Sequence, residues 1–347
     1  MRKFYKQILV AGYCISTITS ASEQLTPVAH WNERASSKYN DVWGYTDEEG
    51  NEYALLGVRD GTSVIRLYDQ QDPVEVGFIP SARSTWKDIK TYEDFAYVVN
   101  ESGGGLQIID LSPLPDSPPV LASTWNGFST SHNLSIDTDR GLLFAEGNHA
   151  MPVRTLSLAD PLNPVSLSSF GVECHDIFAR DGVAFISEGG HGTIGAFDYT
   201  DPENISLTFR FQIPNAGYVH NAWLSKDNRY LMTTEETSNK TIKMWNIENP
   251  NDVRLVSEYL APGKLAHNAH IKGDYAYISH YGSGLRIVDV SGPEAMKEAA
   301  WFSVNEQNPG GFVGAWGAYP FFKSGRVLVS YIESGLYVVN FPGAVEP

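Results

Sequence analysis

A unit on the order of 45 residues recurs along this chain and limits the fold more than any other feature. Each unit opens on a polar dipeptide and a short apolar run, and a turn containing Gly, Asp or Asn leads to a second run. A third run ends in Asp or Asn, a break such as Asp72-Pro73 follows, and a last run closes the unit. The opening dipeptides are Asn40-Asp41, Lys87-Asp88, His132-Asn133, His175-Asp176, His220-Asn221 and His267-Asn268, with an altered seventh near Trp316.

Four short strands in a unit of this length predict a β-propeller, because each blade of that fold is a four-stranded sheet. A helical solenoid would need apolar residues at helical spacing, and the chain lacks that spacing. The seventh unit ends at Phe341-Pro342 without a fourth strand, whereas residues 26–32 resemble the fourth strand at 119–126. We therefore expect an all-β, seven-bladed β-propeller with four-stranded blades, closed by an N-terminal strand in the last blade.

The first 21 residues have the pattern of a secretory signal peptide. Three basic residues precede an apolar run over residues 8–15, and small residues ending at Ala21 follow. That run is too short to cross a bilayer, so we expect no membrane span. The sequence thus predicts a signal peptide over 1–21, cleaved near Ala21, a single propeller domain over 22–347, and a secreted or periplasmic protein.

Charge excludes one class of partner. The chain has 25 basic and 41 acidic residues and a formal net charge of −16. Nucleic-acid binding relies on clustered Lys and Arg, and no basic stripe occurs in this sequence. We therefore expect no nucleic acid among the partners.

Several phrases resemble a known family. The strands Leu106-Gln-Ile-Ile-Asp110 and Leu285-Arg-Ile-Val-Asp289 resemble those of LVIVD-repeat proteins. The phrases Asn40-Asp-Val-Trp-Gly-Tyr45 and Gly314-Ala-Trp-Gly-Ala-Tyr-Pro320 are similar to those of the secreted group called choice-of-anchor B. The resemblance covers nearly the whole chain after residue 21. It implies a secreted propeller and no particular reaction.

Histidines concentrate at one place in the repeat. In a propeller the first strand of each blade lines the central channel, and the second strand runs antiparallel to it. Starts of first strands and ends of second strands therefore share one rim. Eight of the nine histidines fall at or near such positions: His132, His175, His220, His267, His270, His149, His191 and His280. We expect these eight at one end of the channel, together with recurring carboxylates such as Asp88 and Glu188.

Two interpretations of this concentration remain open. Neutral imidazole is a ligand for zinc, iron or copper, so His132, His175, His220 and His267 are candidate ligands of a divalent metal. The candidate ligand-binding residues are His149, His191, His280, Asp88 and Glu188. In the other interpretation, polar residues repeated from blade to blade form structural bonds that tie strand starts to neighbouring loops. The asparagines paired with these histidines suit that second role.

Three classes of function follow from these positions. The first is a binding propeller that takes a glycan, a small molecule or a protein at the channel rim, with or without a divalent metal. The second is a metal-dependent enzyme with a multi-histidine centre, by analogy of architecture with carotenoid-cleaving oxygenases. The third is a polysaccharide lyase in which His220 with Tyr218, or His280 with Tyr281, acts as base and acid. In a lyase Arg59 would neutralise a uronate carboxylate.

Overall fold

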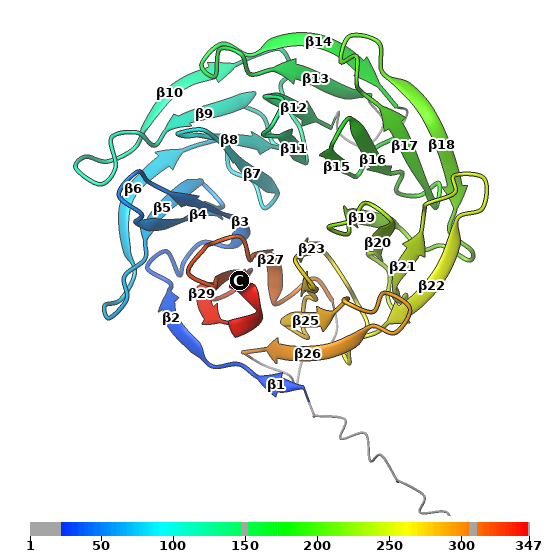
Figure 1. Cartoon of the computed structure of the whole chain (residues 1–347). Coiled ribbons are helices and arrows are strands. Elements are labelled where there is room, and N and C mark those ends of the chain that lie inside the picture. Colours follow the sequence, from blue (N-terminus) through cyan, green and yellow to red (C-terminus); the bar gives the residue numbers. More distant parts are fainter. Residues whose placement is uncertain (1–21, 147–151, 172, 305–310, 346–347) are drawn as a thin grey trace, which may run out of the picture.

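The computed structural model describes residues 22–146, 152–171, 173–304 and 311–345. Seven sheets surround a central channel, and each sheet is one blade with its first strand innermost (Figure 1). The fold is thus the expected all-β propeller of seven four-stranded blades. In the ranges that the structure describes, no helix has the length and apolar character needed to span a bilayer.

The blades follow one another in chain order. Blade 1 contains β3 (Tyr39–Thr46), β4 (Glu52–Val58), β5 (Gly61–Arg66) and β6 (Val74–Pro80). Blade 2 contains β7 (Lys87–Tyr92), β8 (Phe95–Asn100), β9 (Leu106–Asp110) and β10 (Val120–Trp125). Blade 3 contains β11 (Leu134–Asp137), β12 (Leu142–Ala145), β13 (Val153–Ser157) and β14 (Val165–Phe170). Blade 4 contains β15 (Asp176–Arg180), β16 (Val183–Ser187), β17 (Thr193–Asp198) and β18 (Ser206–Gln212).

The remaining blades complete the ring. Blade 5 contains β19 (Val219–Leu224), β20 (Tyr230–Glu235), β21 (Ile242–Asn246) and β22 (Arg254–Tyr259). Blade 6 contains β23 (Ala269–Lys272), β24 (Tyr275–Ser279), β25 (Leu285–Asp289) and β26 (Lys297–Phe302). Blade 7 contains β27 (Ala315–Tyr319), β28 (Arg326–Tyr331), β29 (Gly335–Asn340) and the N-terminal β2 (Pro27–Trp31). A short 3₁₀ helix, η1 (Pro342–Ala344), follows β29.

The two ends of the described chain meet in the last blade. Strand β2 pairs antiparallel with β29 and is the outermost strand of blade 7, which confirms the predicted closure. An additional two-residue strand, β1 (Glu23–Gln24), pairs in parallel with β26 of blade 6. The N-terminal segment therefore joins the last two blades as well as closing the ring.

Burial explains why the inner strands are nearly continuous apolar runs. Blades stack face against face, so both faces of an inner strand are covered, and every residue of β4 is buried. Between blades 1 and 2, for example, Leu55 and Val64 pack in one cluster with Ile89 and Val98. The outermost strands have one face in solvent and include exposed residues such as Val120.

A belt of side chains joins the first strands of neighbouring blades. In three blades the second residue of the opening dipeptide accepts a hydrogen bond from a backbone N–H of the next blade. The bonds are Ile89 N to Asp41 Oδ2 (3.3 Å), Leu134 N to Asp88 Oδ2 (2.8 Å) and Ala269 N to Asn221 Oδ1 (3.1 Å). These bonds support the structural interpretation for Asp41, Asp88 and Asn221, and Asp88 is also one of the candidate ligand-binding residues.

Candidate metal centre

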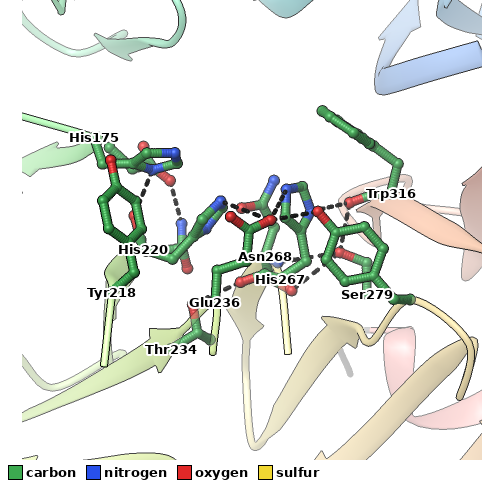
Figure 2. A network of polar contacts seen from close by, with 12 residues as sticks. His175, Tyr218, His220, Thr234, Glu236, His267, Asn268, Ser279 and Trp316 are labelled. Atoms are coloured by element: carbon green, nitrogen blue, oxygen red, sulfur yellow. Dashed lines mark hydrogen bonds and ion pairs between the residues drawn. The ribbon is translucent and has the colours of Figure 1, made fainter. Parts of the chain in front are cut away.

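Four histidines lie side by side at the mouth of the channel. His132, His175, His220 and His267 come from the starts of the first strands of four consecutive blades, 3 to 6. The centroids of successive rings are 4.7, 4.0 and 4.4 Å apart in that order. All four rings line a cavity of ≈770 Å³, and Figure 2 shows three of them together. The structure therefore brings together the four residues proposed as metal ligands.

Two of these histidines are held by backbone carbonyls of the next blade. Nδ1–H of His175 donates to the carbonyl of His220 (3.2 Å), and Nδ1–H of His267 donates to that of Trp316 (2.6 Å). A neutral imidazole that carries its proton on Nδ1 has a lone pair on Nε2. Each ring thus makes a structural bond between blades with one nitrogen and keeps the other nitrogen as a potential metal ligand.

Glu236 completes the set. Its Oε1 lies 3.8 Å from Nε2 of His220 and 3.8 Å from Nε2 of His267, and the Tyr281 hydroxyl donates a hydrogen bond to the same oxygen. In Figure 2 the Glu236 carboxylate lies between these two rings. One ligand atom each from His175, His220 and Glu236 falls within 4.8 Å of the others. Two imidazoles and one carboxylate are a set that suits zinc or non-haem iron.

Burial sets the charges of this set. It lowers the pKa of His220 well below its usual value and lowers the pKa of His267 to about 3. Burial also raises the pKa of Glu236, against the effect of the hydrogen bond from Tyr281. Both imidazoles are therefore neutral at pH 7, which is the protonation state that binds a metal.

His132 is the fourth ring of the row, and a carboxylate holds it. Its Nδ1 lies 2.5 Å from Oε1 of Glu101, a residue that follows β8 in blade 2. Glu101 also lines the cavity. The two residues contribute a second carboxylate–imidazole pair beside the cluster of His175, His220 and Glu236.

The other predicted histidines do not share this mouth. His270 lies deeper in the channel, where its ring contacts Trp223 (4.7 Å between centroids). His280 is fully buried and, among the described residues, lines neither this cavity nor the deeper one. His191 is exposed and pairs with Glu173 (2.9 Å). His149 lies outside the described residues. The expectation that eight histidines meet at one rim is therefore not met.

Glu188 and Asp88 have structural partners. The Glu188 carboxylate accepts two hydrogen bonds of 2.7 Å from the guanidinium of Arg210 and another from the Thr193 hydroxyl. Asp88 belongs to the belt and also pairs with Lys90 (2.5 Å). Neither residue is among the described residues of the ≈770 Å³ cavity, although Asp88 lines a small separate pocket with His132, His220 and His267. The recurrence of acidic residues at these positions reflects bonds within and between blades.

The structure brings only some of the residues proposed for a lyase to the cavity. Tyr218 and Tyr281 line the cavity with His220, but the ring of Tyr218 contacts His175 (5.1 Å between centroids). Arg59 is exposed, and its carbonyl accepts a hydrogen bond from Nζ of Lys87 (3.0 Å). Because neither Arg59 nor His280 is among the described cavity residues, the described mouth lacks the guanidinium and the second base–acid pair of that hypothesis.

Sequence reasoning missed Glu236. The recurring carboxylate of this repeat position is Glu235, which pairs with the ammonium of Lys243 and accepts a hydrogen bond from Gly217 N (2.5 Å). Glu236 is the additional acidic residue directly after β20. A signal was available, because a second carboxylate that the repeat does not require is a better functional candidate than the recurring one. The aromatic residues at the mouth, Trp86, Phe312 and Trp316, were also missed.

Comparisons with known proteins support the repeat architecture. Residues 83–126 and 263–304 match the model of the LVIVD repeat, and these ranges contain all four strands of blades 2 and 6. No curated protein matches the chain.

Solved structures share the fold at low sequence identity. A functionally unknown protein from Desulfotomaculum acetoxidans DSM 771 is 16% identical, with a TM-score of 0.57 over 78% of this chain and 87% of that one. The WD40 repeats of RRP9 are 10% identical, with a TM-score of 0.62 over 88% and 94%. A putative 6-phosphogluconolactonase from Bacteroides uniformis ATCC 8492 is 17% identical, with a TM-score of 0.55 over 74% and 82%. The chain is a seven-bladed β-propeller that carries LVIVD repeats.

Proposed function

We propose that this propeller binds a divalent transition metal at the channel mouth, with His175, His220 and Glu236 as ligands, and holds a small polar molecule in the cavity above it. The observation that carries this proposal is the convergence of three ligand atoms within 4.8 Å. His267 is an additional nitrogen donor, because its Nε2 lies 3.8 Å from the same carboxylate.

The chemistry of the donors supports a transition metal over calcium or magnesium. Calcium and magnesium take oxygen ligands, whereas imidazole suits zinc, copper and iron. Backbone carbonyls hold His175 and His267 by Nδ1, which is the second contact that orients a metal-binding imidazole in many proteins. Bonds of about 2.0–2.2 Å to an ion would draw the three side chains closer than they now lie.

The shape of the mouth supports a small organic ligand. Trp86 and Phe312, at the cavity wall, are 46% and 61% exposed, and Tyr218 and Trp316 add further aromatic surface. A cavity of ≈770 Å³ with aromatic walls and a few converging polar groups is typical of small-molecule sites. We therefore favour a small molecule, including a short glycan, over a protein partner at this cavity.

Metal titration of protein purified without a His-tag tests the proposal. After chelation, calorimetric titration with Zn²⁺, Cu²⁺ and Fe²⁺ is expected to show one site with a Kd below about 10 μM for at least one ion. His220→Ala and Glu236→Gln should each weaken it at least about tenfold, the loss typical of perturbed metal sites. The matched control is His191→Ala, an exposed histidine away from the cavity, which should bind like wild type.

Two results would contradict the proposal. One is the absence of any ion bound more tightly than about 10 μM. The other is equal metal affinity in wild type, His220→Ala and Glu236→Gln. In either case the row of histidines would serve only the bonds between blades, and the aromatic cavity would bind its ligand without a metal.

The same donor set also supports a metal-dependent enzyme as the alternative function. Two imidazoles and one carboxylate leave coordination positions for an exogenous ligand, as in metal-dependent oxygenases and hydrolases. Tyr281, which donates a hydrogen bond to Glu236, places a hydroxyl at the cavity wall beside these positions. Turnover assays on metal-loaded protein, with Tyr281→Phe as the variant, separate an enzyme from a binding protein.

We also propose that the protein is exported and that residues 1–21 are its signal peptide. The basic start and the short apolar run support this proposal. Mass spectrometry of protein from a bacterial host is expected to find a chain beginning at Ser22 outside the cytoplasm. Val10→Arg, which interrupts the apolar run, should keep the full-length chain inside. Export of the uncleaved chain, or of the variant, would contradict the proposal.

A further inference from the structure

A second cavity occupies the channel on the other side of the belt. It has a volume of ≈470 Å³, and its wall includes Trp43, Phe178, Trp223 and Phe321. Beneath these rings lie belt carboxylates, among them Asp41, Asp88 and Asp176, and these three are at most 7% exposed. The cavity therefore combines aromatic faces with buried carboxylates, and the metal site proposed above uses none of these residues.

One side of this cavity already holds an ammonium group. Nζ of Lys90 lies 4.4 Å from the ring centroid of Trp43, 2.5 Å from Oδ1 of Asp88 and 3.9 Å from Oδ2 of Asp41. An aromatic face and carboxylates together are a strong site for a cation, because both attract positive charge where water is excluded. The chain thus satisfies this half of the cavity with its own lysine.

The other side has the same components, but among the described residues no cation forms an ion pair with its carboxylate. Trp223 stands two residues after belt residue Asn221, as Trp43 stands two residues after belt residue Asp41. Nδ2 of Asn221 donates to Oδ2 of Asp176 (2.6 Å), which places a carboxylate beside the belt residue below Trp223. Asp176 also accepts a hydrogen bond from Ile177 N (2.6 Å), and burial raises its pKa to about 7. The charge of Lys90 acts on Asp176, but no described Lys or Arg forms an ion pair with it.

The position that matches Lys90 is occupied here by a neutral side chain. His270 stands at that repeat position in the blade after Trp223, and its ring contacts the indole at 4.7 Å. His270 is 6% exposed, lines the cavity, and its Nδ1 has no hydrogen-bond partner among the described residues. This half of the cavity therefore contains a carboxylate without an ion pair and an imidazole nitrogen without a hydrogen-bond partner among the described residues.

We propose that this cavity binds a small organic ammonium ion, whose charge lies between Asp176 and the ring of Trp223. Phe178 packs against Trp223 (4.5 Å between centroids) and extends the aromatic wall for the apolar part of the ligand. The His270 imidazole accepts a hydrogen bond from the ammonium or from a neighbouring polar group of the ligand. The net charge of −16 raises the local concentration of cations around the molecule.

The test uses the full chain and a pair of matched probes. 2-Phenylethylammonium and the neutral 2-phenylethanol have nearly the same shape and differ in charge. Calorimetry and tryptophan fluorescence are expected to show the ammonium binding with a Kd below about 1 mM and the alcohol binding at least tenfold more weakly, as expected for a desolvated cation over an aromatic face. Protein treated with chelator should give the same result, which separates this site from the proposed metal centre.

Variants locate the site. Asp176→Asn keeps the side-chain shape and should weaken ammonium binding tenfold or more, and Trp223→Leu should weaken it several-fold. Circular dichroism checks that each variant is folded. If Asp176→Asn does not fold, the affinity of Trp223→Leu for the ammonium still tests the site. The control is Trp86→Leu at the opposite mouth, which should leave the affinity unchanged.

Several results would overturn the proposal. They are no binding of the ammonium up to 10 mM, equal binding of the alcohol, or wild-type affinity in both Asp176→Asn and Trp223→Leu. Binding of a neutral sugar such as galactose in place of the ammonium would assign the cavity to carbohydrate.

Discussion

At the scale of single residues, the histidines of this protein show how one side chain serves structure and chemistry together. Nδ1 of His175 and of His267 bonds to a backbone carbonyl of the next blade, and Nε2 remains for the cavity. The two interpretations that the sequence leaves open are therefore compatible, because they concern different atoms of the same ring. His270 has the opposite situation, since burial among aromatic rings leaves its Nδ1 without a described partner.

The burial of His270 makes the folded protein sensitive to acid. Burial, with the nearby charge of Lys90, lowers its pKa to about 3, whereas an unfolded histidine titrates near 6.5. Between these values the unfolded chain binds more protons, so the stabilising contribution is full above pH 6.5 and is lost as the pH falls toward 3.

We expect His270→Phe to reduce this sensitivity to acid. The loss of unfolding free energy from pH 7 to pH 5, measured by urea denaturation, should be smaller in the variant than in wild type by about 2 kcal/mol. The phenyl ring keeps the contacts with Trp223 and Phe321, so the comparison within each protein isolates the titration. An equal loss in both proteins would show that His270 is protonated in the folded state.

At the scale of elements, the outer strand of every blade has the same irregularity. The pairing between the third and the outermost strand shifts register in all seven blades, including the pairing of β29 with the N-terminal β2. A bulge at this place increases the twist of the strand, as the edge of a propeller blade requires. Strand β2 is thus a true fourth strand of blade 7, although it comes from the other end of the chain.

Deletion of residues 22–33 tests this closure. It removes β1 and β2, exposes the edge of β29 and eliminates Trp31, which is only 2% exposed. Loss of a buried indole alone costs about 3–5 kcal/mol, so the melting temperature should fall sharply. Deletion of residues 22–24 is the control, because it removes only the two-residue pairing of β1 with β26. This shorter deletion should lower the melting temperature much less. Equal melting temperatures for both deletions would mean that β2 does not stabilise the ring.

At the scale of the whole molecule, the belt divides one channel into two sites. The mouth beyond the belt collects imidazoles and carboxylates, and the opposite cavity collects aromatic rings above the belt carboxylates. Both sites use the same few positions of the repeat, filled by different residues in different blades. Substitution at these positions changes the chemistry of a site while the bonds between blades are kept, which is how a repeat fold carries function.

The sequence by itself determined the blade count, the strand order and the closing strand. Those features depend on local periodicity, because a phrase such as Leu285–Asp289 predicts the third strand of a blade wherever it occurs in the chain. It also placed His132, His175, His220 and His267 in one row, because equal positions in successive blades are related by the rotation of the propeller.

Only the tertiary structure decided which other groups reach that row. Glu236 meets His220 and His267 because it lies one residue beyond the end of β20, and the extra residue turns its carboxylate into the cavity. By strand register His280 matches Glu235, and both are packed inside the protein, whereas Tyr281 matches Glu236 and also lines the cavity. A repeat fixes where a residue stands along its strand, whereas the packing between blades fixes which space its side chain enters.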